Sequence, residues 1–204
     1  MRVSLRYLLL CSVSLLFISS VAARTAELEA AKLAYEQRDY AVALKQLIPL
    51  AQQGNGEAQA LLASMYLRGQ GVPRDIGQAR NWYESAAAKG NPEGQLQLGA
   101  MYLTGAGGAK DTVQGLKLLK LVAEQGKSDA YLILGLAYMN IKDTPRDLVQ
   151  ADMWLNLAAK GGDQYAPAQI AHAEQQMTSD QIAKARAWAA AWKPSKPFVS
   201  TETH

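Results

Sequence analysis

Apolar residues recur at helical spacing along most of the chain, and the pattern itself repeats every 36 residues. Leu62, Leu98 and Leu134 are each followed by a small residue at the next position and by a tyrosine at the fourth position. Spacings of 0, +1 and +4 place three side chains on one face of a helix. The pattern therefore predicts an all-α protein in which pairs of short antiparallel helices stack on neighbouring pairs to bury their apolar faces.

Polar residues and glycines in the same register mark where the helices begin and end. An aspartate followed by glutamine three positions later is typical of an N-cap, because the carboxylate accepts orphan backbone N–H groups and the glutamine can bond back. A glycine after an apolar run is typical of the left-handed residue that ends a helix. The columns are Asp39, Asp75, Asp111 and Asp147, of which the last three precede such a glutamine, then Gly54, Gly90, Gly126 and Gly162, and Ala51, Ala87, Ala123 and Ala159.

The outermost helix pairs depart from this pattern, as capping units of a repeat array do. The first pair is predicted over residues 26–38 and 40–53, and the last pair over residues 164–176 and 179–192. Thr178 with Gln181 forms a capping-box pattern at the start of the final helix. Trp188 and Trp192 lie four positions apart, and we expect them to cover the open end of the stack. Residues 193–204 contain two prolines and no periodic pattern, which predicts a flexible tail.

The first 23 residues have the pattern of a secretory signal. Arg2 and Arg6 form a basic start, an apolar run covers residues 8–20, and small residues follow up to Ala23, where cleavage is predicted. The run is too short and too rich in serine for a membrane span of about 20 residues, although an uncleaved anchor stays an alternative. Cys11 is the only cysteine, so the cleaved chain contains none and forms no disulfide. A periplasmic or secreted protein is expected, with no membrane span after cleavage.

The stretch over residues 60–90 resembles the Sel-one-like repeat, a relative of the tetratricopeptide repeat. The resemblance covers residues 26–192, within a predicted repeat domain of residues 24–192. It weakens in the second unit, where Leu118 and Leu119 replace the aromatic pair, and in the third, whose Gly-x-Gly loop is lost. In the first unit the motif is met by Leu62, Tyr66, Gly69, Gly71, Val72, Asp75, Ala79, Trp82, Tyr83, Ala86, Ala87 and Gly90, with Ala63 where the family has glycine.

The resemblance implies an α-solenoid, a right-handed superhelix that binds proteins or peptides. Exported bacterial members of the family are linked to envelope functions, and the family has no shared catalytic residues. Some cysteine-rich relatives are described as binding or hydrolysing β-lactams, but these carry a cysteine pair in each repeat. The cleaved chain has no cysteine, so the resemblance implies no enzymatic activity here.

Composition and candidate chemistry add little to this picture. Apolar residues make up 49% and charged residues 19%, as in a folded globular protein. The net charge of +3 falls to +1 once Arg2 and Arg6 are removed, which gives no electrostatic reason to expect nucleic-acid binding. The only histidines are His172 and His204, and no Ser-x-x-Lys motif occurs. The glycine-rich segment 105–112 follows the repeat register rather than a strand. No catalytic residue, cofactor or metal ligand is therefore predicted.

One surface is a candidate for binding. In stacked helix pairs the first helices line the concave face, so their positions away from the packing face should meet a partner. An alternative is that several of these side chains pack between neighbouring pairs. The predicted residues are Ser64, Leu67 and Arg68, then Leu96, Ala100, Leu103 and Thr104, then Leu132, Leu136, Met139 and Asn140, with Ala60 beside the first group.

The repeat array, the export signal and the lack of catalytic groups predict a periplasmic scaffold that binds a protein or peptide of the cell envelope. A structural component of an envelope machine for secretion, polysaccharide or the flagellar motor is the alternative. An enzyme acting on peptidoglycan or β-lactams is a third, which lacks a visible nucleophile or carboxylate pair. The partner and the oligomeric state stay open.

Overall fold

The computed structural model describes residues 23–140 and 146–195, and every regular element within these ranges is an α-helix. The predicted signal, except Ala23, and the tail beyond Ser195 lie outside the described residues. The helices are one over residues 23–36, followed by α2 (Tyr40–Gln52), α3 (Gly56–Arg68), α4 (Ile76–Ala88), α5 (Pro92–Thr104), α6 (Thr112–Glu124), α7 (Asp129–Asn140), α8 (Leu148–Lys160), α9 (Ala166–Glu174) and α10 (Ser179–Ala191).

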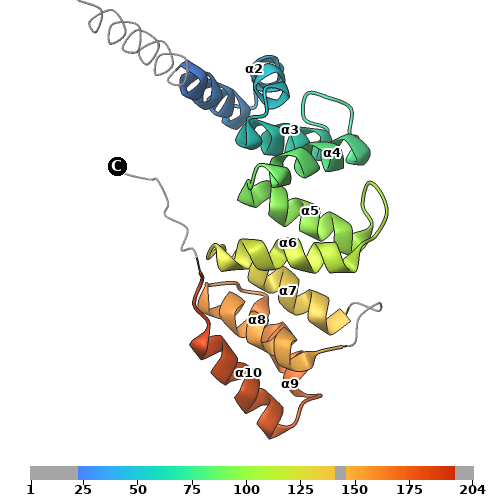
Figure 1. The fold of residues 1–204 in the computed structure, drawn as a ribbon, viewed down its shortest axis with the longest axis vertical. Helices are drawn as coiled ribbons and strands as arrows, with labels where there is room; N and C mark the ends of the chain where they lie inside the picture. The colour runs from blue at the N-terminus through green and yellow to red at the C-terminus, as the bar shows by residue number, and fades with distance from the viewer. Residues whose placement is uncertain (1–22, 141–145, 196–204) are drawn as a thin grey trace, which may run out of the picture.

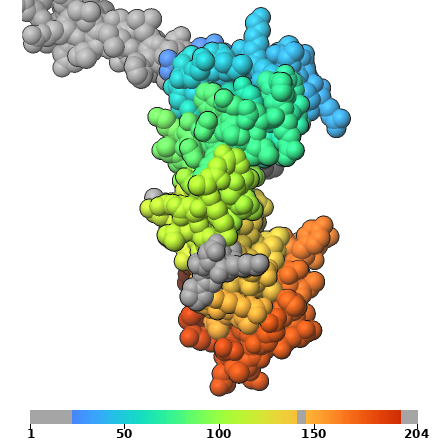
Figure 2. Space-filling model, turned by 90° about the vertical axis from the view of Figure 1, so that its right-hand side faces the viewer, coloured from blue at the N-terminus to red at the C-terminus, as the bar shows by residue number. Residues whose placement is uncertain are grey.

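The helices form an elongated stack in which sequence neighbours lie side by side, as Figure 1 shows from α2 at one end to α10 at the other. α3 packs on α4, α5 on α6 and α7 on α8, while α4 on α5 and α6 on α7 join successive pairs. The space-filling view shows the same order along the column (Figure 2). The prediction of stacked helix pairs is confirmed, because the cores join each pair to the next.

The predicted helix caps are formed. The Oδ1 atoms of Asp75, Asp111 and Asp147 accept backbone N–H bonds of 2.9–3.0 Å from the glutamines three positions later. The reciprocal bond of a capping box is formed at the start of α10, where the Thr178 N–H donates to Oε1 of Gln181 at 2.8 Å. The glycines of the terminal column have φ between +77° and +91°, which L side chains rarely adopt, and this explains why glycine recurs there.

Small residues in the first helices allow close approach of the second helices. A Cβ atom on Gly135 would lie 2.6 Å from Cγ of Leu155, and one on Gly99 would lie 2.9 Å from Cγ of Leu119. Ala63, which takes the same position in the first repeat, is fully buried. The sequence interpretation of this column as a close-packing position is therefore confirmed.

A glycine outside the predicted columns controls the contact between two repeats. A Cβ atom on Gly94, in α5, would lie 2.6 Å from Cβ of Ala86 and 2.9 Å from the backbone nitrogen of Ala87. Gly94→Ala is expected to lower the free energy of unfolding by about 1–2 kcal/mol, because overpacking against backbone outweighs the gain in helix propensity. Urea denaturation followed by circular dichroism measures this difference.

Gly77 provides the matched control for that substitution. It lies within α4, and the neighbour that an added Cβ would meet is Oδ1 of Asp75 at 3.3 Å. Gly77→Ala should leave stability unchanged or raise it by up to about 1 kcal/mol. A Gly94→Ala variant as stable as Gly77→Ala would contradict the proposed close contact between α4 and α5.

Arg80 joins the first repeat to the loop of the second, a role that the sequence did not indicate. Its side chain is buried, and its guanidinium lies 4.5 Å from the ring centroid of Tyr102. Nη1 donates to the carbonyl oxygen of Ala109 at 3.0 Å, and Nε pairs with Glu84 at 3.2 Å. The glycine-rich loop therefore serves as a structural connection held by a buried cation.

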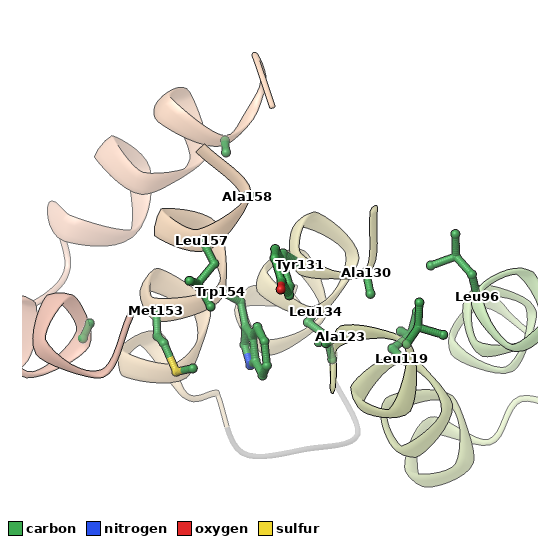
Figure 3. Close-up of a cluster of buried hydrophobic side chains, with 13 residues drawn as sticks. Leu96, Leu119, Ala123, Ala130, Tyr131, Leu134, Met153, Trp154, Leu157 and Ala158 are labelled. Atoms are coloured by element: carbon green, nitrogen blue, oxygen red, sulfur yellow. The ribbon is translucent and has the colours of Figure 1, made fainter. Parts of the chain in front are cut away.

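An aromatic cluster joins α7 and α8 (Figure 3). Trp154 of α8 lies beside Tyr131 of α7, with ring centroids 5.8 Å apart. Trp192 meets Trp154 edge to face at 4.8 Å and packs against the core that α7 and α8 share. Trp188 is 41% exposed, and its ring lies beneath Lys184. Of the two tryptophans predicted to cover the open end, one therefore packs inward and the other lies on the outside of α10.

Candidate functional site

A hollow of about 640 Å³ opens on the side of the stack formed by the first helices. The helix over residues 23–36 and α3 supply one wall, and the start of α5 supplies the other. Ala60, Leu61, Leu96 and Val122 contribute apolar surface. Its charged lining consists of Lys32, Glu36, Glu57, Arg68, Glu93, Lys127 and Asp129. An apolar base with both signs of charge around it is suited to a polypeptide segment.

Lys32 fixes the relation between two walls of the hollow. Its Nζ lies 2.8 Å from Oε1 of Glu57 in α3 and 3.1 Å from Oε1 of Glu29 in its own helix. The hydrogen bond to Glu57 raises the pKa of Lys32, and the bond to Glu29 adds to this, while partial burial acts in the opposite direction. The lysine therefore stays charged and holds the first helix against α3.

A chain of polar contacts crosses the same end of the hollow. The Tyr35 hydroxyl donates to Oε1 of Gln70 at 3.0 Å, and Nε2 of Gln70 donates to the Tyr40 hydroxyl at 3.0 Å. Nη1 of Arg68 reaches the Tyr35 hydroxyl only at 3.5 Å, and Arg68 is exposed. The guanidinium can therefore turn toward a carboxylate or a backbone carbonyl of a bound segment.

Behind the hollow, the Tyr83 hydroxyl of α4 is hydrogen-bonded to Ser64 of α3. Burial raises the pKa of Tyr83 to about 12, with a further contribution from the nearby charge of Glu93. The phenol is neutral at physiological pH, so it anchors Ser64 and supplies no base for catalysis.

Acidic residues at the starts of the first helices form a further column with the 36-residue spacing. Glu57, Glu93 and Asp129 lie in the first turns of α3, α5 and α7, and all three line the hollow. Negative charge in a first turn is favoured by the helix dipole, which explains the column locally. The 36-residue spacing of this column is visible in the sequence, but these residues are not part of the predicted concave surface.

The profile of the Sel1 repeat matches residues 56–91, 92–127 and 128–163, three consecutive units that cover just over half of the chain. The chain belongs to the Sel1 repeat family. Proteins built from Sel1 repeats generally mediate protein–protein interactions, and the hollow is lined by residues of the matched units together with the preceding helix. Among curated proteins, no relative matches the sequence.

Two solved structures show the same fold. A Sel1 repeat protein from Oxalobacter formigenes is 30% identical, with a TM-score of 0.63, over 71% of this chain and 57% of its own. A protective antigen present in uropathogenic Escherichia coli strains, displaying an SLR fold, is 30% identical, with a TM-score of 0.71, over 87% of this chain and 40% of its own. This Sel1 repeat chain therefore spans about half the length of these relatives.

The structure brings together only part of the concave surface predicted from the sequence. Ser64, Arg68 and Leu96 line the hollow of this Sel1 repeat protein, together with Ala60. Leu96 is only 7% exposed, so little of its side chain is accessible to a bound segment. Sequence reasoning missed the contribution of the preceding helix, through Lys32 and Tyr35. Lys32 and Tyr35 precede the first matched Sel1 repeat, and a lysine and a tyrosine three positions apart do not by themselves indicate a binding site.

The remaining predicted residues do not line the hollow. Met139 is 3% exposed and packs with Leu155 and Ala173, so this position belongs to the core. Leu67 and Leu103, in the same column, are partly buried against the cores of their own Sel1 repeats. These three positions face the second helix of each pair, because the apolar surface of each first helix is wider than the sequence pattern suggested. Ala100, Leu132 and Leu136 are partly buried, and Thr104 and Asn140 are exposed.

Other kinds of site find little support in the described part of this Sel1 repeat chain. Within it, no three His, Cys, Asp or Glu side chains are grouped as a metal ion requires. His172 lies exposed on α9. In the same ranges, no helix combines the length and apolar character needed to cross a membrane.

Proposed function

We propose that this protein is an exported scaffold that holds a segment of a partner protein of the bacterial envelope in the hollow between its first helices. The observation that carries the proposal is the hollow itself, because it lies across consecutive Sel1 repeats and combines an apolar base with charges of both signs. Backbone groups and charged side chains of an extended segment find partners there, while its apolar side chains meet Leu61.

The export part of the proposal rests on the first 23 residues. Their basic start, short apolar run and small residues before Ala23 favour secretion across the inner membrane. An envelope partner follows from that location. A family whose members mediate protein–protein interactions supports a scaffold over an enzyme.

A photocrosslinking amino acid in place of Glu93 tests the proposal in cells that make the protein. We expect it to link an envelope protein, and Arg68→Glu should lower the crosslinking yield about tenfold, because the partner loses a charge-assisted contact worth about 1.4 kcal/mol. Fractionation and mass spectrometry of the product identify the partner and its compartment.

Lys45 provides the control for both changes. It is exposed on α2 and does not line the hollow, so a crosslinker at Lys45 should give no such product, and Lys45→Glu should not alter the yield at Glu93. Recovery of the protein only in the cytoplasm, or equal yields at both positions, would overturn the proposal.

A further inference from the structure

The outer face of α6 exposes apolar side chains that the fold does not cover. Val113 is 71% exposed and Leu121 is 38% exposed, and Leu116 lies partly buried between them. Lys117 and Lys120 are exposed on the same face. These five residues and Glu124 line a groove of about 450 Å³, which is separate from the hollow described above.

The repeat register shows that the exposed part of this apolar face is not required by the fold. On α4, the positions equivalent to Leu116 and Leu121 hold Arg80 and Ser85. Arg80 pairs there with Glu84, and Ser85 bonds to the backbone of its own helix. Leu116, like Arg80, packs partly against neighbouring helices of the stack. A Sel1 repeat of the same chain forms with Gly77 and Ser85 at the positions of Val113 and Leu121, so these exposed apolar side chains on α6 are not required for the packing of the repeat.

The equivalent face of α8 is covered by another helix of the chain. Leu157, the equivalent of Leu121, is 7% exposed, and Met153, the equivalent of Lys117, is 8% exposed. Both belong to a core cluster with Ala185 of α10, and α10 packs on α8. In the last repeat this face is therefore covered by a helix, while the described residues place no helix on the equivalent face of α6.

Charge decides which occupant suits α6. The face carries Lys117 and Lys120 against one acid, Glu124, and Nζ of Lys120 lies 5.6 Å from the ring centroid of Tyr138, at the border with α7. A symmetric contact between two copies of the chain would place like charges opposite each other, which is unfavourable. A helix with acidic residues beside an apolar stripe complements both features.

We propose that the outer face of α6 is a second docking surface, which binds an amphipathic, acidic helix of a partner protein. The helix lies along α6, with its apolar side chains on Val113, Leu116 and Leu121 and its carboxylates near the two lysines. This surface does not depend on the hollow, so the protein can join two partners.

Selection from a displayed library of random 16-residue peptides against the full chain tests this surface. Peptides that also bind the Val113→Asp/Leu121→Asp variant are removed, and both substitutions lie at exposed positions where the fold tolerates them. We expect the remaining peptides to carry apolar residues three or four positions apart, flanked by Asp or Glu. Lys117→Glu/Lys120→Glu should weaken their binding at least tenfold in fluorescence anisotropy. Replacing the acids of the peptide by lysines should restore binding to that variant.

Three outcomes would overturn the proposal. The first is that no peptide distinguishes the full chain from the Val113→Asp/Leu121→Asp variant, or that those recovered show no preference for acidic residues. The second is a dimer of the full chain that the same variant dissociates in sedimentation analysis, which would assign the face to a second copy. The third is binding to phosphatidylglycerol vesicles that this variant abolishes in the absence of selected peptides, which would assign it to a lipid surface. Failure here leaves the Glu93 crosslink intact, so the two proposals are tested separately.

Discussion

Replacing Asp152 by asparagine is expected to raise the free energy of unfolding by about 2–3 kcal/mol at pH 7.5. Asp152 of α8 is fully buried, and neither carboxylate oxygen has a hydrogen-bond partner among the described residues. Burial raises the pKa of Asp152 to about 6, and the charge of Glu174 in α9 adds to this, while Arg186 in α10 and the nearby amide of Asn156 oppose it. A pKa of about 6 in place of the ordinary value near 4 corresponds to about 3 kcal/mol of unfavourable ionisation in the folded state.

The sign of the pH dependence follows from the raised pKa. The folded protein binds the Asp152 proton more tightly than the unfolded chain, so this group favours folding below about pH 4. That contribution is lost as the pH rises to about 6 and above. The asparagine that replaces it does not titrate, so the stability difference between variant and parent should grow from pH 4 to pH 7 and then stay constant. Urea denaturation at several pH values measures it.

Asp180 gives a matched control in the same part of the fold. It is exposed in the first turn of α10, so Asp180→Asn removes a carboxylate without relieving burial and should change stability by less than about 0.5 kcal/mol. If Asp152→Asn and Asp180→Asn behave alike, or if Asp152→Asn is less stable than the parent at pH 7.5, the carboxylate has a partner and the burial argument is wrong.

Trp154→Ala is expected to lower the free energy of unfolding of the last repeat by about 3–5 kcal/mol. The indole is 3% exposed and contacts the rings of Tyr131 and Trp192. Its removal loses the buried area, both ring contacts and the packing of the chain after α10. Hydrogen exchange should show the loss concentrated in α7 to α10, because each repeat contacts chiefly its neighbours.

Trp188→Ala tests whether position rather than residue type decides this effect. The ring is 41% exposed beneath Lys184, so its removal should cost about 1 kcal/mol or less. Equal exchange rates in the two variants would contradict the assignment of Trp154, and not Trp188, to the core. An unchanged melting temperature in Trp154→Ala would do the same.

The sequence predicted most of the fold because each repeated residue performs a local task. Asp75, Asp111 and Asp147 cap helices, and glycines end them, in any context with that backbone, so their spacing alone located the helix boundaries. The prediction for the last pair was less accurate at α9, which begins at Ala166 because Asp163 accepts the N–H groups of the two residues before Pro167.

The candidate site was harder to predict because it depends on how helices face one another. Met139 and Asn140 are neighbours in α7 and lie about 100° apart around its axis, yet the first is buried and the second is exposed. Periodicity defines an apolar stripe but does not define its edges. The wall supplied by Lys32 and Tyr35 depends on contacts with Glu57 and Gln70, more than 20 residues away, which no local pattern contains.

The cover that α10 forms over α8 also limits how copies of the chain can join. Repeat arrays offer matching surfaces at their two ends, and copies that meet head to tail through such ends grow into open fibres. Here the surface that a following unit would use is occupied by the chain's own last helices, which bury Met153 and Leu157. A second copy that packed on this face of α8 would first have to displace α9 and α10, which disfavours open fibres grown through that face.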